Sequence, residues 1–379
     1  MTKSTSNIIR TILLGIIYLA VSCNSHNGNN ENNVEPVSVL ELPPSPNNPR
    51  NSEGDFIELK SGKLLFIYTH YDTGSGVDHD PAYLASRNSV DAGMTWSDTD
   101  DIVMGNEGSQ NIMSVSLLRL NNGDIALFYL RKNSSEDCIP IMRVSKDEAR
   151  TWGPPVQCIG KKGYYVLNND RVIQLNDGTL MFAVSEHKSK DKIFDAQGNL
   201  YAYFSEDNGK TWKSSKKVPN ETKIITQEPG LIEMGDGRIM MFIRTNDGKQ
   251  YLSYSSDKGL SWSHILPSNI PSPLSPASIE KIPGSNHWIM VWNNNDGSMT
   301  DIKNKRTPLT VAISKDEGVS WKNVKNIETE KDGWFCYTAI YFVKNDILLA
   351  YCAGDRSDKN YNGLARTRLA KLGRSWLYR

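Results

Sequence analysis

Residues 205–212 read Ser-Glu-Asp-Asn-Gly-Lys-Thr-Trp, and four more segments of the chain repeat this pattern. A unit that returns every 50 to 60 residues is typical of a propeller or a solenoid. In each copy the Asp can accept backbone N–H bonds and the Gly can adopt a positive φ, which predicts a tight turn. The second copy has Ala149 in place of the Gly, so we expect that turn to be strained or differently shaped. The other copies occupy residues 89–96, 145–152, 255–262 and 314–321.

A strand, a Gly-containing turn and a second strand recur between these octapeptides. Clear copies surround Gly62, Gly123, Gly178 and Gly237, and looser ones lie at residues 279–292 and 340–351. Short apolar runs bounded by Asn, Asp and Gly are typical of β-hairpins. Six hairpins, five of them followed by the Asp-bearing turn, predict an all-β, six-bladed β-propeller over residues 37–379. We expect residues 37–42 and 363–372 to complete the sixth blade, with no helix of useful length and no second domain.

The composition restricts the class of protein. Among 379 residues, 43 Lys and Arg balance 43 Asp and Glu, and 38% are hydrophobic. This composition is too polar for a polytopic membrane protein, and the lack of a basic surplus argues against a nucleic-acid-binding role. The six His show no metal-ligand spacing, so we predict no catalytic metal and no other cofactor. Cys138, Cys158, Cys336 and Cys352 allow three sets of two disulfides, and the sequence does not choose between them.

The N-terminal segment is predicted to direct export. Lys3 and Arg10 precede an apolar run at residues 11–21. A short basic segment followed by such a run is the pattern of a secretory signal peptide. No other segment is long enough to span a bilayer.

The end of that signal resembles a bacterial lipoprotein signal. Residues 1–22 would be removed, and Cys23, which follows Ser22, would be acylated as the new N-terminus. A plain signal peptide and an uncleaved anchor are the alternatives, and Ala20 departs from the Leu that is more usual at its position. Residues 23–36 are Asn-rich and predict a flexible tether. We therefore expect an exported protein that a lipid anchor holds in the cell envelope.

The repeated octapeptide resembles the Asp-box turn of the sialidase (neuraminidase) superfamily, and the resemblance extends over residues 45–372. Asp-boxes are more specific for the fold than for the reaction. In that superfamily three arginines bind the substrate carboxylate, an Asp acts as acid/base, and a Tyr is the nucleophile with a Glu as its base. A hydrophobic pocket completes the site. The resemblance therefore implies an exo-acting glycoside hydrolase that binds acidic glycans.

Five residues match the arginine, Glu and Tyr positions of the superfamily. Glu228, in Gln-Glu-Pro-Gly-Leu, lies 16 residues before Arg244, and the resemblance implies the Glu base and the second arginine on adjacent inner strands. Tyr337, in Cys-Tyr-Thr-Ala-Ile, resembles the nucleophile at the start of the sixth blade. Arg306 lies eight residues before the fifth Asp-box and resembles the third arginine, and Arg50 opens the first blade where the first arginine belongs.

Asp78 lies on the loop where the superfamily has its acid/base Asp, and Asp80 competes with it for the role. An acid must carry a proton to donate it, so we expect burial or a neighbouring carboxylate to raise the pKa of Asp78. The sequence departs from the superfamily beside Arg50, where Arg-Ile-Pro is usual and this chain has Arg-Asn-Ser-Glu. The carboxylate of Glu53 would alter what the pocket accepts, so Glu53 is a candidate substrate-binding residue.

Four further polar residues lie at blade starts or strand ends and match no position of the superfamily. We interpret them as the lining of a subsite for a particular sugar. The alternative is that some of them satisfy buried backbone groups. They are Asn169, Asp170, Arg171 and His187.

The expected chemistry follows from the charges. Sialic acid carries a carboxylate on its reacting carbon, and Arg binds a carboxylate through two parallel bonds. That carboxylate would repel an anionic nucleophile, whereas a neutral Tyr that is deprotonated as it attacks avoids the repulsion. Two successive displacements retain the anomeric configuration. The alternatives are a sialidase-fold glycosidase or lyase that acts on a different glycan, and a non-catalytic glycan-binding propeller.

Overall fold

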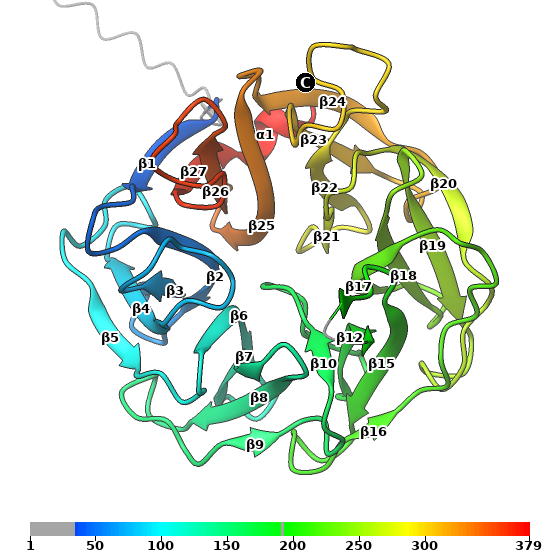
Figure 1. Cartoon of the computed structure of the whole chain (residues 1–379), viewed down its shortest axis with the longest axis horizontal. Coiled ribbons are helices and arrows are strands. Elements are labelled where there is room, and N and C mark those ends of the chain that lie inside the picture. The colour runs from blue at the N-terminus through cyan, green and yellow to red at the C-terminus, as the bar shows by residue number, and fades with distance from the viewer. Residues whose placement is uncertain (1–34, 191–192) are drawn as a thin grey trace, which may run out of the picture. The chain divides into compact units, whose positions relative to one another are not determined.

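The computed structural model describes residues 35–190 and 193–379, which form a ring of β-sheets around a common axis (Figure 1). The predicted signal peptide at residues 1–22, Cys23 and nearly all of the predicted 23–36 tether lie outside the described residues. In the part of the chain that is described, no helix has the length and apolar character needed to cross a membrane.

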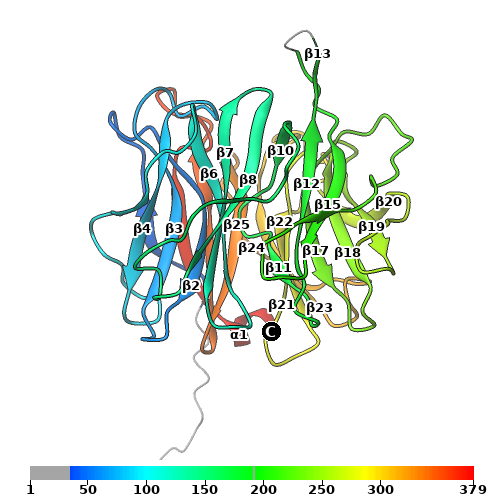
Figure 2. The ribbon, with the colours of Figure 1, turned by 90° about the horizontal axis from the view of Figure 1, so that it is seen from below.

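The first three blades cover residues 50–214. The first contains β2 (Arg50–Glu58), β3 (Leu64–Tyr71), β4 (Ala82–Ser89) and β5 (Asp101–Met104). The second contains β6 (Asn111–Arg119), β7 (Ile125–Ser134), β8 (Asp137–Ser145) and β9 (Val156–Gln157). The third contains β10 (Tyr164–Val166), β11 (Ile173–Gln174), β12 (Leu180–His187), β15 (Asn199–Ser205) and β16 (Lys213–Ser214). A short hairpin of β13 (Ser189–Lys190) and β14 (Ile193–Phe194) projects from one face of the ring (Figure 2).

The last three blades complete the ring. The fourth contains β17 (Thr226–Glu233), β18 (Ile239–Thr245), β19 (Lys249–Ser255) and β20 (Leu266–Pro271), and the fifth contains β21 (Ser278–Lys281), β22 (Trp288–Asn293), β23 (Leu309–Ser314) and β24 (Lys322–Glu328). The sixth contains β25 (Gly333–Val343), β26 (Asp346–Asp355), β27 (Thr367–Gly373) and β1 (Val37–Leu42), followed by the one-turn helix α1 (Arg374–Leu377). Because β1 pairs with β27, the predicted closure of the ring by the N-terminal strand is confirmed.

The second and third blades are joined into one sheet of nine strands, whereas each of the other four blades is a sheet of four strands. Tyr164 of β10 pairs in parallel with Cys138 of β8, and Tyr164 also pairs with His187 of β12. The inner strand of the third blade is thereby divided into β10 and β11. The residues between them bond to the second blade instead, with Asp170 N–H donating to the Val115 carbonyl at 3.0 Å.

Each Asp-box turn is held by the same side-chain network. In the 205–212 copy, Ser205 Oγ donates to Asp207 Oδ1 and accepts from Gly209 N–H, both at 2.8 Å, while Thr211 N–H and Oγ1 donate to the two Asp207 oxygens. Ala149 keeps this pattern at a φ of 63°, with its N–H donating to a Ser Oγ at 2.8 Å. The second turn is therefore strained, as expected, but it is not differently shaped.

The Asp-box turns also join neighbouring blades. A Cβ on Gly209 would lie 2.1 Å from the sulfur of Met142, which belongs to the second blade. Trp212 of the same turn packs against Phe128 and Phe182, with ring centroids 6.0 and 5.0 Å away. Burial of such side chains between neighbouring blades gives each blade a shared core with the blade before it.

Replacing Ala149 by Gly should stabilise the protein. The left-handed φ costs Ala about 1 kcal/mol, and replacement by Gly removes this strain. The greater conformational freedom of Gly in the unfolded chain offsets part of the gain in stability. We expect the free energy of unfolding in urea to rise by less than about 1 kcal/mol. The matched change, Gly209→Ala, should lower it by about 1–3 kcal/mol because the new methyl group overlaps Met142. A destabilised A149G variant would contradict this account of the turn.

Candidate active site

The inner strands of five blades each place one non-glycine residue in the left-handed backbone region. These residues are Glu53, Ser114, Asp170, Glu228 and Tyr337, with φ between 43° and 62°. Pairing shifts register next to four of them, in β2, β6, β17 and β25. A bulge of this kind changes the direction of a side chain relative to the alternation of the strand. The bulges thus bring Glu228 and Tyr337, from different blades, into contact.

Tyr337, Glu228 and Arg244 form one hydrogen-bonded chain. The Tyr337 hydroxyl donates to Glu228 Oε1 at 3.1 Å, and Arg244 Nη1 donates to Glu228 Oε2 at 2.5 Å. The Cζ of Arg306 lies 5.4 Å from the centre of the Tyr337 ring, and its Nη1 donates to Cys336 Sγ at 3.0 Å. Tyr337, Arg244 and Arg306 are each less than 10% exposed. Four of the predicted site residues therefore meet near the axis of the ring.

The charges in this group set the protonation of Glu228 and Tyr337. Burial alone would raise the pKa of Glu228, but the charges of Arg244 and Arg306 lower it below its ordinary value. Burial, and next the negative charge of Glu228, raise the pKa of Tyr337 above its ordinary value. At neutral pH the Tyr337 hydroxyl is therefore protonated and hydrogen-bonded to an ionised carboxylate, which is the arrangement of a nucleophile with its base.

Arg50 belongs to a second network. Its Nε donates to Ser52 Oγ at 2.9 Å, and its Nη1 donates to the Gly76 carbonyl at 3.2 Å and to Asp78 Oδ1 at 2.6 Å. Its Nη2 lies 3.3 Å from Glu53 Oε1. The side chain is 1% exposed. The predicted first arginine is thus surrounded by acceptors from the protein itself.

Asp78 and Asp80 have different surroundings. Asp80 Oδ2 accepts the N–H groups of Ser75 and Val77 at 2.8 and 3.1 Å, so this carboxylate holds the loop together. Burial alone would raise the pKa of Asp78, but the charges of Arg50 and Lys132 lower it to about 2. The expectation of a raised pKa for Asp78 is therefore wrong, because the carboxylate is in an ion pair.

Glu53 is the carboxyl group in this network that retains a proton. Burial raises its pKa to about 7, although the positive charge of Arg50 acts in the opposite direction. Two carboxyl groups thus share one guanidinium. Asp78 is ionised at neutral pH, whereas Glu53 is protonated below about pH 7.

Asn169, Asp170 and Arg171 do not line the hollows beside Tyr337. Asn169 Nδ2 donates to the carbonyls of Gly54 and Tyr337 at 2.9 and 3.1 Å. Asp170 Oδ2 accepts the N–H of Ile340, and Arg171 Nη2 donates to the carbonyl of Ala277. These contacts favour the alternative for the three residues, because each of them bonds to a buried backbone group of another blade.

His187 supports the backbone of Glu228. Its Nε2 is 3.0 Å from Ser185 Oγ, which accepts the N–H of Glu228 at 3.4 Å. Its Nδ1 is 2.9 Å from the Asp195 carbonyl, and burial lowers the pKa of the imidazole. His187 is therefore a neutral neighbour of the site in the free protein.

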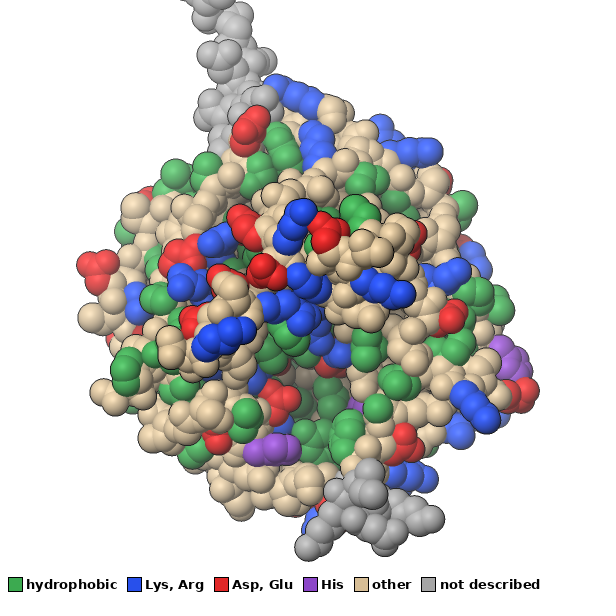
Figure 3. All heavy atoms as spheres, turned by 45° about the horizontal axis from the view of Figure 1, so that its top comes forward, with side chains coloured by type: hydrophobic (Ala, Val, Ile, Leu, Met, Phe, Trp, Pro, Cys, Tyr) green, Lys and Arg blue, Asp and Glu red, His purple; other side chains and the backbone are tan. Residues whose placement is uncertain are grey.

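Two hollows adjoin the networks. One of about 510 Å³ is lined by Arg50 and Asp78, and one of about 400 Å³ is lined by Arg244 and Arg306. Trp334 and Arg356, which match no motif in the sequence, line both hollows. Figure 3 shows Lys and Arg side chains, together with Asp and Glu, gathered around the central depression of this face. The one feature of the sequence that could have pointed to Arg356 is its position directly after the buried strand β26.

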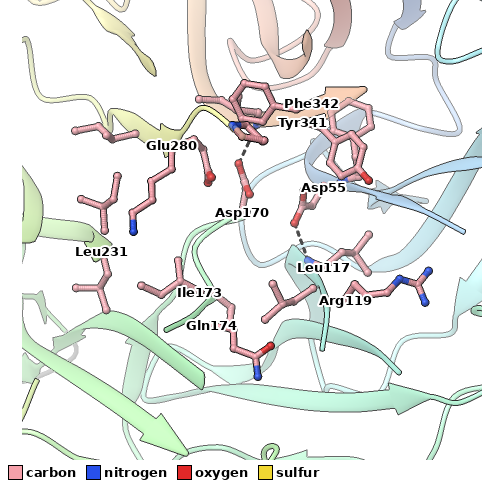
Figure 4. A pocket seen from close by; sticks show the side chains of 18 of the residues that line it. Asp55, Leu117, Arg119, Asp170, Ile173, Gln174, Leu231, Glu280, Tyr341 and Phe342 are labelled. Atoms are coloured by element: carbon pink, nitrogen blue, oxygen red, sulfur yellow. Dashed lines mark hydrogen bonds between the residues drawn. The ribbon is translucent and has the colours of Figure 1, made fainter. Parts of the chain in front are cut away.

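A third hollow, of about 510 Å³, lies along the parts of the inner strands that follow the bulges. The carboxyl groups of Asp55, Asp170 and Glu280 point into it from three blades (Figure 4). Burial raises the pKa of Asp170 to about 7 and raises the pKa values of Asp55 and Glu280 well above the ordinary range. Among the described residues, no three His, Cys, Asp or Glu side chains are grouped so as to hold a metal ion.

None of the four described cysteines forms a disulfide bond. Cys336 and Cys352 are opposite one another on β25 and β26. Like Cys138 and Cys158, they are buried free thiols.

A model of the BNR repeat-like domain matches residues 86–349. The chain belongs to this family. The matched region of the BNR repeat-like domain contains Glu228, Arg244, Arg306 and Tyr337, but it begins after Arg50 and Asp78.

The chain is similar in sequence to a sialidase and similar in structure to several solved proteins. The chain is 25% identical to a sialidase of Clostridium perfringens over 242 residues, or 56% of this chain and 60% of that protein, so it spans less than two thirds of that relative. It superposes on a protein of unknown function from Dyadobacter fermentans with a TM-score of 0.71 and 15% identity, covering 89% of this chain and 99% of that one. It also superposes on the leech intramolecular trans-sialidase, complexed with 2,7-anhydro-Neu5Ac, with a TM-score of 0.69 and 14% identity over 90% and 71% of the two chains. The fold is a sialidase β-propeller.

The stability of the ring should fall as the pH rises from 5 to 8. The pKa of Asp170 is about 7 in the folded protein and about 3.9 in an unfolded chain. Below about pH 4 both states hold the proton, and the contribution to stability is complete. Between the two pKa values the unfolded state binds fewer protons, so the free energy of unfolding decreases until the pH passes about 7.

Asp170→Asn tests this dependence, because the amide stays neutral and its oxygen can still accept the Ile340 N–H. Between pH 5 and pH 8, the free energy of unfolding in urea should decrease less for D170N than for the unchanged protein. The exposed Asp98→Asn serves as the control and should leave the difference unchanged. An equal pH dependence in D170N would contradict the assignment.

Proposed function

We propose that the protein is a retaining glycoside hydrolase of sialidase type, which removes a terminal sialic acid or related acidic sugar from glycans. The observation that carries the proposal is the 3.1 Å hydrogen bond from Tyr337 to Glu228, with Arg244 and Arg306 beside it. A neutral hydroxyl with an ionised base suits attack on a carbon that bears a carboxylate. The 25% identity to the Clostridium perfringens sialidase supports the same reaction class.

The proposed reaction has two displacements. In the first, the Tyr337 oxygen attacks the anomeric carbon and its proton passes to Glu228, while the bond to the leaving oxygen breaks and that oxygen takes a proton from an acid. In the second, water attacks the same carbon, the former acid takes the proton of the water, and Tyr337 leaves and recovers its proton from Glu228. Each displacement inverts the carbon, so the configuration of the sugar is retained.

The proton donor belongs to the Arg50 network. Asp78 occupies the position implied by the superfamily resemblance, but it must leave its ion pair with Arg50 before it can hold a proton. Glu53 already holds a proton at a pH below about 7. Both groups contact the same guanidinium, so a substrate that disturbs Arg50 would alter the protonation of both.

A sialidase-fold enzyme for another acidic glycan is the second candidate. It is favoured by Glu53, a buried carboxyl group 3.3 Å from Arg50, next to the hollow that Arg50 lines. Screening sialosides against uronic-acid glycosides separates the two candidates. No release from any sialoside by the folded protein would exclude the sialic-acid claim.

We also propose that the protein acts outside the cytoplasm on a lipid anchor at Cys23, with residues 1–22 removed. The support is the order of basic segment, apolar run and Ser-Cys in the sequence. A labelled fatty acid should be incorporated into the unchanged protein and not into the Cys23→Ala variant. Incorporation that persists in the variant would overturn this assignment.

Loss of the Tyr337 hydroxyl should remove turnover. We expect Tyr337→Phe and Glu228→Gln each to lower kcat on a fluorogenic sialoside by about 10²–10⁴-fold, because they remove the nucleophile or its base. Tyr341→Phe is the matched control, since its hydroxyl lies on the same strand but accepts the N–H of Glu58. Proton NMR of the first product should show retained anomeric configuration. Inversion would contradict a Tyr nucleophile.

The proton donor can be identified by varying the leaving group. An activated aryl glycoside needs little protonation of the leaving oxygen, whereas a natural disaccharide needs it fully. The variant that lacks the donor, either Asp78→Asn or Glu53→Gln, should therefore lose at least about 10-fold more activity on the disaccharide than on the aryl glycoside. A Glu53 donor would also give a rate on the disaccharide that declines above about pH 7. If each variant loses the same activity on the disaccharide as on the aryl glycoside, neither Asp78 nor Glu53 is the proton donor.

A further inference from the structure

Three guanidinium groups line the 400 Å³ hollow beside Tyr337. They belong to Arg244, Arg306 and Arg356, and the one carboxylate among the lining residues is that of the exposed Asp296. Arg244 and Arg306 contact Glu228 and the Tyr337 ring, respectively. The hollow is thus positively charged, and two of its arginines connect it to the proposed nucleophile and its base.

Arg356 is the member of this group whose side chain has neither an ion pair nor a hydrogen bond within the described chain, whereas Arg244 donates to Glu228 and Arg306 donates to Cys336. No carboxylate of the described residues lies within ion-pair distance of it, and its Nε is buried without a hydrogen-bond acceptor. Its Cζ lies 3.9 Å from the centre of the Trp334 ring, and the Cζ of Arg306 lies 5.2 Å from the same ring. The ring attracts both cations, but the two positive charges repel each other.

Arg50 has the opposite surroundings. Ser52, Gly76, Asp78 and Glu53 already surround its N–H groups, and the side chain is 1% exposed. An incoming carboxylate would have to displace Asp78 to reach it. Arg356 is half-buried and needs no such exchange.

We propose that the hollow between Arg244, Arg306 and Arg356 binds the carboxylate of the substrate, and that Arg356 supplies the third guanidinium in place of Arg50. The inference rests on the proposed function and assigns a specificity residue to it. Because Arg306 lies against the Tyr337 ring, a carboxylate bound to Arg306 would be close to the nucleophile, and the substrate would be a sugar acid whose carboxylate is attached to the reacting carbon. Arg50 instead holds Asp78 and Glu53.

The test measures binding and needs no turnover. The probes are the unsaturated 2-deoxy analogue of N-acetylneuraminic acid and its primary amide, titrated calorimetrically into the full chain and into Arg356→Met. Methionine keeps the length of the side chain over Trp334 and removes the charge. The exposed Lys359→Met removes the same charge three residues away and serves as the control.

We expect R356M to weaken binding of the acid by about 10- to 100-fold, as loss of a charge-assisted bond predicts. Binding of the amide should change by less than about 3-fold, and K359M should bind both probes as the unchanged chain does. Arg356→Lys should recover part of the loss, because it restores the charge but not the planar fork.

Three outcomes would overturn the inference: an R356M variant that binds the acid normally, equal weakening of acid and amide, or an unchanged chain that does not prefer the acid. The proposed function is judged separately. If the protein hydrolyses sialosides but R356M does not selectively weaken binding of the acid, this inference alone is rejected. If R356M selectively weakens binding of the acid but the protein hydrolyses no sialoside, the carboxylate site is supported and the proposed sialidase activity is rejected.

Discussion

The bulge in the inner strands is the constraint on which the site depends. A regular strand alternates its side chains between two faces, and each inner strand of a propeller is covered on both faces by neighbouring blades. The left-handed residue in each bulge breaks this alternation, at a cost of about 1–3 kcal/mol for a non-glycine residue. Bonds between blades offset the cost, such as those from Asn169 to the carbonyls of Gly54 and Tyr337. Glu228 and Tyr337 meet because both occupy bulges.

The charges divide into two networks with different chemical character. Around Arg50 the positive charge is balanced by Asp78 and Glu53, and one of these carboxyl groups keeps a proton near neutral pH. Around Arg306 and Arg356 no carboxylate within ion-pair distance balances the charge in the described chain. We therefore assign the proposed proton donor to the first network and the proposed carboxylate site to the second. Trp334, which lines both hollows, lies between them.

Repetition made the fold predictable from the sequence. Each Asp-box determines its own turn by bonds between residues two to four positions apart, so its geometry is local. Six hairpins, five of them followed by an Asp-box, predict the number of blades and the closing role of residues 37–42, which the pairing of β1 with β27 confirms. The joined second and third blades were not predictable, because the pairing of Tyr164 with both Cys138 and His187 is non-local and leaves no periodic signal. The same holds for the contacts that make Asn169, Asp170 and Arg171 structural.

The sequence by itself determined the blades and their turns, because the repeat is local. Its resemblance to the sialidase superfamily selected Glu228, Arg244, Arg306 and Tyr337 as candidates. Tertiary structure decided the partners. A pKa depends on every charge within several ångströms, and the ion pair that lowers the pKa of Asp78 joins it to Arg50, 28 residues away in the sequence. Arg356 has no motif, and its unpaired charge beside Arg306 is a property of two loops from different blades. Electrostatics act through space, and residue spacing along the chain does not record them.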